Sequence, residues 1–438
     1  MCSGPFRVPR FPAPGVRWLK DLLAGVYRMT DLSVGKRIAR LRDIRELTQE
    51  QLAERADVSI DTIRRLEQGT QRGARITTYQ KLAAALDIEL ARLLGQPTMT
   101  NSLAPQGGLV ALRAAIQTPG DLPGLEQYGN DSDAPSAADL RPVLKKARGY
   151  YQRGEFTDLV TMLPGLVSDL RAATREAEGG PDHDTVWSLS AAAHILVAEV
   201  AAQLGQTDLA YTAVERAMHA TARASDELRH ALAVSTLSFV LLRQGRWSEA
   251  QQVAARKAAE IEPRFSDNIP QAFAMFGVLL LSGAVSASRA KRTDSDSSKD
   301  EAFTLLRRAK AAAELCGPVR VRGTSFGPAS VGMQATTIQV SLGHPDQAIE
   351  TASKVNVAEL PWEISRARHR LDVAFARYQT QDDQGARQVL LDLDEKHPEW
   401  LTHQVLAAST VEGLLENERR RDRELRKLAG RLGVDPAL

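Results

Sequence analysis

Residues 47–69 read LTQEQLAERADVSIDTIRRLEQG, and the fold of the N-terminal part of the chain follows from this stretch. Its first half predicts a short amphipathic helix. Thr48 stands at the N-cap position, and Gln51, three residues later, completes a capping box in which side chain and backbone bond each other reciprocally. Leu52 and Ala53 then face a core from one side of the helix.

The second half of the stretch predicts a tight turn and another helix. The turn is the segment ADV at positions 56–58, and Ser59 supplies the next N-cap. Ile63 and Leu66, three residues apart, form the buried stripe of the helix that follows. Two short helices joined by a turn of three or four residues make a helix-turn-helix, whose second helix can enter the major groove of DNA.

The whole segment resembles the Cro/phage-repressor family of bacterial regulators, also called the xenobiotic-response-element family. The resemblance runs from about Val34 to Leu94, with VGKRIARLRDIRE before the motif and YQKLAAALDIELARLLG after it. We expect Val34, Ile38 and Leu41 to face inward. The chain departs from the family at Asp57, where a glycine in a left-handed turn is usual. Because Asp tolerates that conformation better than most residues, we expect the turn to form.

Five short helices are predicted in this segment. They are Val34–Arg45, Gln49–Ala56, Ile60–Gln68, Thr77–Leu86 and Ile88–Leu94. The resemblance implies that Ile60–Gln68 is the recognition helix, because matching positions of the family meet base edges.

Arginine on this helix suits base recognition, because Arg64 and Arg65 can each donate two hydrogen bonds to a guanine. Ile60 can pack against a thymine methyl group. Asp61 either accepts a hydrogen bond from cytosine N4 or pairs with an arginine of its own helix. A solvated helix face is the alternative interpretation of both arginines.

Further contacts to the DNA backbone are implied by the resemblance, at Gln49 in particular. The expected DNA-binding residues are Thr48, Gln49, Ser59, Ile60, Asp61, Thr62, Arg64, Arg65, Arg72 and Arg75. The last two lie in the loop after the recognition helix and are expected to contact phosphate.

Length and charge limit what the rest of the chain can be. At 438 residues the chain is long enough for at least two domains. Its formal net charge is only +2, so any basic surface that binds nucleic acid must be local. Cys2 and Cys316 provide neither a disulfide framework nor zinc-binding spacing. We therefore expect a cytoplasmic protein without a metal or a cofactor.

Composition divides the chain into four parts. Residues 1–28 lack periodicity and precede MTDLSVGKRIARL, so we expect a disordered tail, or a misannotated start with Met29 as the true one. The DNA-binding domain is expected at 29–96 and a linker with one short helix, LVALRAAI, at 97–137. Helical repeats follow at 138–438. The apolar run FAMFGVLLLSGAV lies within them, and it is too short to span a bilayer, so we expect a buried helix.

A repeated pattern predicts the fold of residues 138–438. A glycine followed five residues later by Ala, or once by Leu, recurs at Gly154 and Leu159, Gly205 and Ala210, Gly245 and Ala250, and Gly343 and Ala348. Glycine permits the tight turn between two helices, and the small residue lets the helices pack closely. The pattern resembles the tetratricopeptide repeat, with GRWSEAQQVAARKAAEIEP as the closest copy. We therefore predict an all-α protein: a five-helix DNA-binding domain followed by an α-solenoid of six or seven helical hairpins, with AKRTDSDSSKDE as a polar loop insertion.

No catalytic motif is found: there is no phosphate-binding loop, no nucleophile elbow and no metal-spaced cluster. The chain is thus predicted to be a transcription regulator and not an enzyme. We expect a homodimer, joined through the final hairpins from Trp362 onward, that reads a near-palindromic operator in double-stranded DNA. A peptide, a small molecule or a protein bound to the repeats would control it. In the alternative interpretation, the chain is an adaptor whose repeats bind a protein partner and whose DNA binding is secondary.

Overall fold

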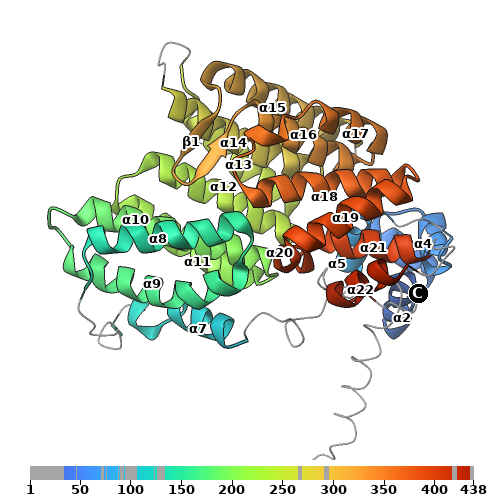
Figure 1. The fold of residues 1–438 in the computed structure, drawn as a ribbon, viewed down its shortest axis with the longest axis horizontal. Coiled ribbons are helices and arrows are strands. Elements are labelled where there is room, and N and C mark those ends of the chain that lie inside the picture. The colour runs from blue at the N-terminus through green and yellow to red at the C-terminus, as the bar shows by residue number, and fades with distance from the viewer. Residues whose placement is uncertain are drawn as a thin grey trace, which may run out of the picture.

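The computed structural model describes residues 34–45, 47–70, 74, 76–86, 88, 93, 106–122, 124–125, 134–264, 269–290, 295–416 and 422–434. The predictions made for residues 1–28, for Arg72 and Arg75, and for most of the fifth helix lie outside these residues. Within them the chain is almost entirely helical, as the repeated helical patterns predict (Figure 1).

Among the described residues, four helices form the N-terminal part, called the head below. They are α2 (Val34–Ile44), α3 (Gln49–Ala56), α4 (Ile60–Glu67) and α5 (Ile76–Ala85). The residues predicted to face inward are buried, with Val34, Ile38 and Leu41 on α2 packed against Leu52 of α3 and Ile63 of α4. The head therefore has a hydrophobic core of its own.

The helix predicted inside the linker is α7 (Gln106–Ile116), followed by a short 3₁₀ turn at Pro119–Asp121. It packs on α9 and α11 of the repeat region, where it buries Leu109, Leu112 and Ile116. The linker helix is thus part of the repeat core and not of the head.

A helical repeat-like array, called the array below, follows α7. Its helices are α8 (Ala137–Arg153), α9 (Phe156–Glu176), α10 (His183–Gln203), α11 (Thr207–Arg223), α12 (Glu227–Arg243), α13 (Trp247–Glu260), α14 (Pro270–Ala287), α15 (Ser295–Cys316), α16 (Pro328–Leu342), α17 (Pro345–Ser353), α18 (Glu363–Gln379), α19 (Asp383–Lys396), α20 (Pro398–Thr402), α21 (Val405–Glu416) and α22 (Arg423–Leu432), with a 3₁₀ turn at Val357–Glu359. Consecutive helices pack as hairpins.

The recurring glycines occupy the predicted turns. Gly154, Gly205, Gly245 and Gly343 all adopt left-handed backbone, with φ of 81°, 75°, 77° and 72°. The small or apolar residue five positions after each glycine is fully buried in every case. Glycine is favoured at these turns because a side chain would strain the left-handed conformation.

Two details of the array differ from the sequence-based prediction. A β-hairpin, β1 (Val319–Val321) and β2 (Thr324–Phe326), interrupts the helices, with antiparallel pairing of Val319 to Phe326. It forms because apolar residues alternate along VRVRGTSF around a two-residue turn, where Arg322 and Gly323 have positive φ. The predicted polar loop insertion is also wrong in part, because its residues from Ser295 onward belong to α15.

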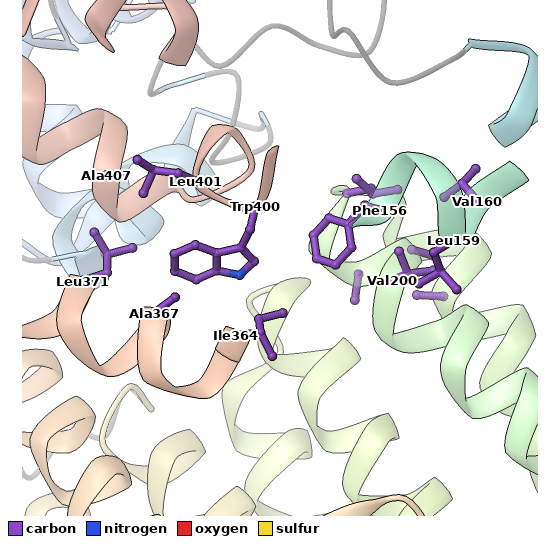
Figure 2. Close-up of a cluster of buried hydrophobic side chains, with 14 of the residues drawn as sticks. Phe156, Leu159, Val160, Val200, Ile364, Ala367, Leu371, Trp400, Leu401 and Ala407 are labelled. Carbon is purple, nitrogen blue, oxygen red and sulfur yellow. The ribbon is translucent and has the colours of Figure 1, made fainter. Parts of the chain in front are cut away.

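The array curves back until its last helices meet its first hairpin. In Figure 2, Trp400 of α20 lies between α18 and Phe156 at the start of α9. A Cβ atom on Gly154 would lie 2.8 Å from that of Trp400, and Thr157 donates a hydrogen bond of 2.6 Å to Glu399 through its hydroxyl. The inner face of the array is therefore partly closed where these helices meet.

Two helices, α10 and α14, are long and apolar enough to cross a membrane by length and composition alone. Most of each helix is buried inside the fold, 67% and 61% of the most apolar window respectively. The apolar run at Phe273–Val285 forms part of α14 and is a core helix, as its length predicts.

Candidate nucleic-acid interface

The ends of α3 and α4 are capped as their sequences predict. The amide of Gln51 donates to the Thr48 hydroxyl over 3.2 Å, and the Thr48 amide donates to Gln51 Oε1 over 2.8 Å. Ser59 accepts a hydrogen bond of 3.2 Å from the Thr62 amide and shares a second bond of 2.8 Å with its hydroxyl. These caps fix where α4 begins and therefore which side chains project from its first turn.

The turn between the two helices tolerates Asp57 in place of the usual glycine. Asp57 has φ 50° and ψ 54°, which is the left-handed conformation expected from the resemblance. Lys81 of α5 donates hydrogen bonds of 3.0 Å to both the carbonyl and the carboxylate of Asp57. The lysine thus ties Asp57, a residue in strained left-handed backbone, to α5.

The inner face of α4 is packed tightly against α2. Ile63 and Leu66 are buried, and Gly35 of α2 lies directly against the Leu66 carbonyl. A Cβ atom on Gly35 would be only 1.9 Å from that oxygen. This close approach sets the position of the recognition helix relative to the rest of the head.

The outer face of α4 is open to solvent. Asp61, Arg64 and Arg65 are exposed. The guanidinium of Arg64 lies 3.5 Å from the carboxylate of Glu50, with 48% and 64% of the two side chains exposed, and Arg65 Nε donates to the Asp61 carbonyl over 3.2 Å. Exposed pairs of this kind contribute little stability, so both guanidinium groups can exchange these partners for others. The carboxylate of Asp61 has no ion pair among the described residues.

The remaining expected contacts lie in more constrained surroundings. Ile60 is half-buried and packs on the head core, so only part of its side chain faces outward. The hydroxyls of Thr48, Ser59 and Thr62 belong to the caps, and each keeps a face toward solvent at the N-terminal ends of α3 and α4. Among the described residues of the expected site, Arg64 and Arg65 share the exposed face of α4 with Asp61, and the others lie at the N-terminal ends of α3 and α4.

Gln49 belongs to a network that the sequence does not reveal. Its amide donates a bond of 2.6 Å to Glu67, whose carboxylate also accepts bonds of 2.8 and 3.2 Å from Arg42. The hydrogen bond with Glu67 raises the pKa of Arg42, although burial opposes the shift. Residues 42 and 67 are far apart in sequence, and no periodic pattern connects them. The network joins the end of α4 to α2 and positions the Gln49 side chain.

The head is docked on the array through α21. The backbone amide of Val34, the first residue of α2, donates a bond of 2.6 Å to the buried carboxyl of Glu412. Burial raises the pKa of Glu412 to about 7, against the lowering effect of Arg37. Arg37 is itself buried and donates a bond of 2.7 Å to the Leu93 carbonyl. Since the outer face of α4 stays exposed in this arrangement, docking leaves it open.

No metal site accompanies this interface: the described residues contain no group of three or more His, Cys, Asp or Glu that could hold a metal ion. No curated protein matches the chain. Residues 38–93, which contain α3, α4, α5 and most of α2, match the helix-turn-helix family. The head is therefore similar to the Cro/C1-type helix-turn-helix domains of DNA-binding transcription regulators.

Proposed function

We propose that this chain is a cytoplasmic, sequence-specific transcription regulator that reads double-stranded DNA with α4. The observation that carries the proposal is the outer face of α4. There Asp61, Arg64 and Arg65 project from a firmly capped helix, are exposed while the head is docked, and have only weak partners. Such side chains can enter a major groove without first breaking a buried contact.

Each residue has a role that follows from its chemistry. Arg64 and Arg65 donate to guanine O6 and N7, and the exposed part of Ile60 contacts a thymine methyl. Gln49, together with the capped N-termini of α3 and α4, meets phosphate. Arg72 and Arg75 in the loop after α4 are proposed to add further phosphate contacts.

We propose that the regulator is a homodimer, because one helix-turn-helix covers only one half-site and makes few base contacts. The dimer would read a near-palindromic operator with its two heads about one DNA turn apart. Among the described residues, no large exposed hydrophobic side chain lies beyond Trp362. A dimer contact through the final hairpins would therefore be polar. We also propose that an effector bound to the array controls DNA binding by the heads.

The test is selection of binding sites from random double-stranded DNA with the purified full chain and no added partner. The expected result is a near-palindromic motif, bound by two copies of the chain as judged by light scattering of the complex. If the chain selected no motif, the adaptor interpretation would replace this one. If it selected a motif but bound as a single copy, the dimer alone would be wrong.

A further inference from the structure

The curved array surrounds a partly open cavity of about 360 Å³. Its walls come from the helices that face the inside of the curve, α12, α14, α16 and α18, with additions from β2 and α20. This volume falls within the range of small-molecule sites in proteins. The cavity lies far along the chain from the head and belongs to no part of the DNA interface.

Three arginines line the cavity: Arg243, Arg289 and Arg368. No aspartate or glutamate is among the lining residues. Arg368 pairs at 3.4 Å with Asp372, which is buried and accepts a bond of 2.6 Å from Thr337. Three positive charges therefore face one negative charge, which leaves an excess of two.

Two of these arginines are held in place without a carboxylate partner. Arg243 donates through Nε to the Ala202 carbonyl over 3.2 Å, and Arg289 donates through Nε to the Ser341 hydroxyl over 3.3 Å. Among the described residues, neither guanidinium forms an ion pair. Burial lowers the pKa of each to about 10, and the charge of Arg368 adds to the effect on both. Both groups stay protonated at neutral pH.

Gathering like charges in a half-buried space is unfavourable unless an anion or water compensates them. Fixed guanidinium groups of this kind suit a carboxylate, a sulfonate or a phosphate, each of which accepts paired N–H donors. The arrangement therefore favours one anionic group beside Arg243, Arg289 and Arg368.

The rest of the lining is mixed, because serines, threonines and glutamines are about as numerous in it as apolar residues. Phe239, Leu242, Leu281, Val285 and Ile364 contribute to it, and the aromatic ring of Trp362 is held by the Arg320 guanidinium 5.1 Å away. The lining serines and threonines that are bonded mostly bond one another or the backbone, as Ser235 and Ser282 do at 2.9 Å. An inorganic anion alone would leave these apolar walls without a partner.

One lining residue has an unused donor. The indole Nε1 of Trp400 is buried and has no hydrogen-bond partner among the described residues. In Figure 2 the nitrogen-bearing edge of Trp400 is turned toward Ile364, which also lines the cavity. An acceptor on a bound molecule could satisfy this donor.

We propose that the cavity binds a small organic anion, whose single charged group is held by Arg243, Arg289 and Arg368 and whose apolar body lies against Phe239, Leu281 and Trp362. The volume of the cavity suits a compact molecule better than a long peptide. Binding itself is independent of the proposed function. Only its consequence for DNA, as the effector of the array, depends on it.

The experiment is a fluorescence titration of the full chain, without DNA, with anilinonaphthalenesulfonate and its uncharged parent N-phenylnaphthylamine. The two dyes share an apolar body and differ in the anionic group. We expect one saturable site for the sulfonate, at least tenfold tighter than for the uncharged dye. Energy transfer from Trp362 and Trp400 should accompany binding. Octanoate should displace the sulfonate, whereas octylamine and inorganic sulfate should not.

Variants locate the site. Arg243→Gln and Arg289→Gln should each weaken binding of the sulfonate at least tenfold and change binding of the uncharged dye less than twofold. Arg246→Gln is the matched control, because Arg246 lies on the outer side next to α13 and pairs with Glu249 at 2.8 Å. If a glutamine variant failed to fold, the corresponding lysine variant would be measured in its place. The displacement experiments on the wild-type chain, with octanoate, octylamine and sulfate, would also still test the site. Equal binding of the two dyes, displacement by octylamine or by sulfate, or unchanged affinity in folded Arg243 and Arg289 variants would overturn the proposal.

Discussion

On α4 of the head, Arg64 and Arg65 extend into solvent, whereas Arg243 and Arg289 in the array lie half-buried around a partly open cavity. The exposed pair keep much of their hydration and have only weak partners, so they suit a polyanion that is met by many small contacts. The cavity arginines have lost part of their hydration and are fixed through Nε, so they suit one compact anion. In the two proposals the same type of side chain thus serves two kinds of recognition, and the degree of burial distinguishes them.

The largest expected difference between the two regions is in the response to salt. If a dimer makes roughly six phosphate contacts, its affinity for DNA should fall about a thousandfold between about 50 and 200 mM salt. A single anion in a half-buried cavity is screened far less, so its affinity should change less than about threefold. Parallel titrations of one protein preparation measure both slopes. Similar slopes would show that the exposed arginines of α4 and the half-buried arginines of the cavity do not differ in how they bind anions.

The next effect concerns the placement of α4. Gly35→Ala should destabilise the head by about 3 kcal/mol, because the new Cβ would meet the backbone carbonyl of Leu66 at 1.9 Å. DNA binding should fall with it, while the array and its cavity stay intact. Urea unfolding with separate probes of head and array measures this. Gly165→Ala, on an exposed part of α9 with open space around it, is the control and should stabilise by about 0.5–1 kcal/mol.

Removing the exposed arginines tests the head alone. Arg64→Ala and Arg65→Ala should each cost about 1–3 kcal/mol in operator affinity and relax base preference locally, because each removes a bidentate contact. Protein stability should hardly change. Competition binding with operator and scrambled DNA measures both effects, with Arg246→Ala as the control. Retention of full specificity by both variants would show that α4 does not read bases.

The smallest expected effect is that of pH on the contact between head and array. The pKa of Glu412 is raised to about 7 by burial, with Arg37, Glu416 and Tyr79 around it. When folding raises the pKa of a carboxyl, the protein loses stability as pH rises from the unfolded pKa through the folded pKa of that group. Between about pH 6 and pH 8 the free energy of unfolding of the wild-type chain should therefore fall by about 1 kcal/mol relative to that of Glu412→Gln. Unfolding curves of both proteins over this range provide the measurement. A constant difference would exclude titration of Glu412.

Much of the head could be predicted from sequence, because its structure is fixed by local rules. Capping at Thr48 and Ser59, the buried stripe at Ile63 and Leu66, and the left-handed turn at Asp57 depend on neighbours a few residues away. The turns of the array were predictable for the same reason.

The parts that the sequence did not reveal depend on long-range packing. The bond from Val34 to Glu412 and the grouping of Arg243 with Arg289 and Arg368 arise only when distant helices meet. The β-hairpin had a local signal, the alternation around Arg322-Gly323, but its flanks are helical and its strands have three residues each. Closure of the array likewise follows from the sum of many small angles between hairpins, which no single repeat encodes.

The bond between Val34 and Glu412 also has a consequence for synthesis of the chain. Its two partners are separated by 378 positions. At about 5–20 residues per second, the ribosome needs roughly 20–75 s to add α21 after the start of the head has been made. During that interval the head lacks its contact with α21, so its folding depends on its own core around Ile38, Leu52 and Ile63. The newly made chain therefore has a free head first and acquires the docked arrangement only after α21 has been synthesised.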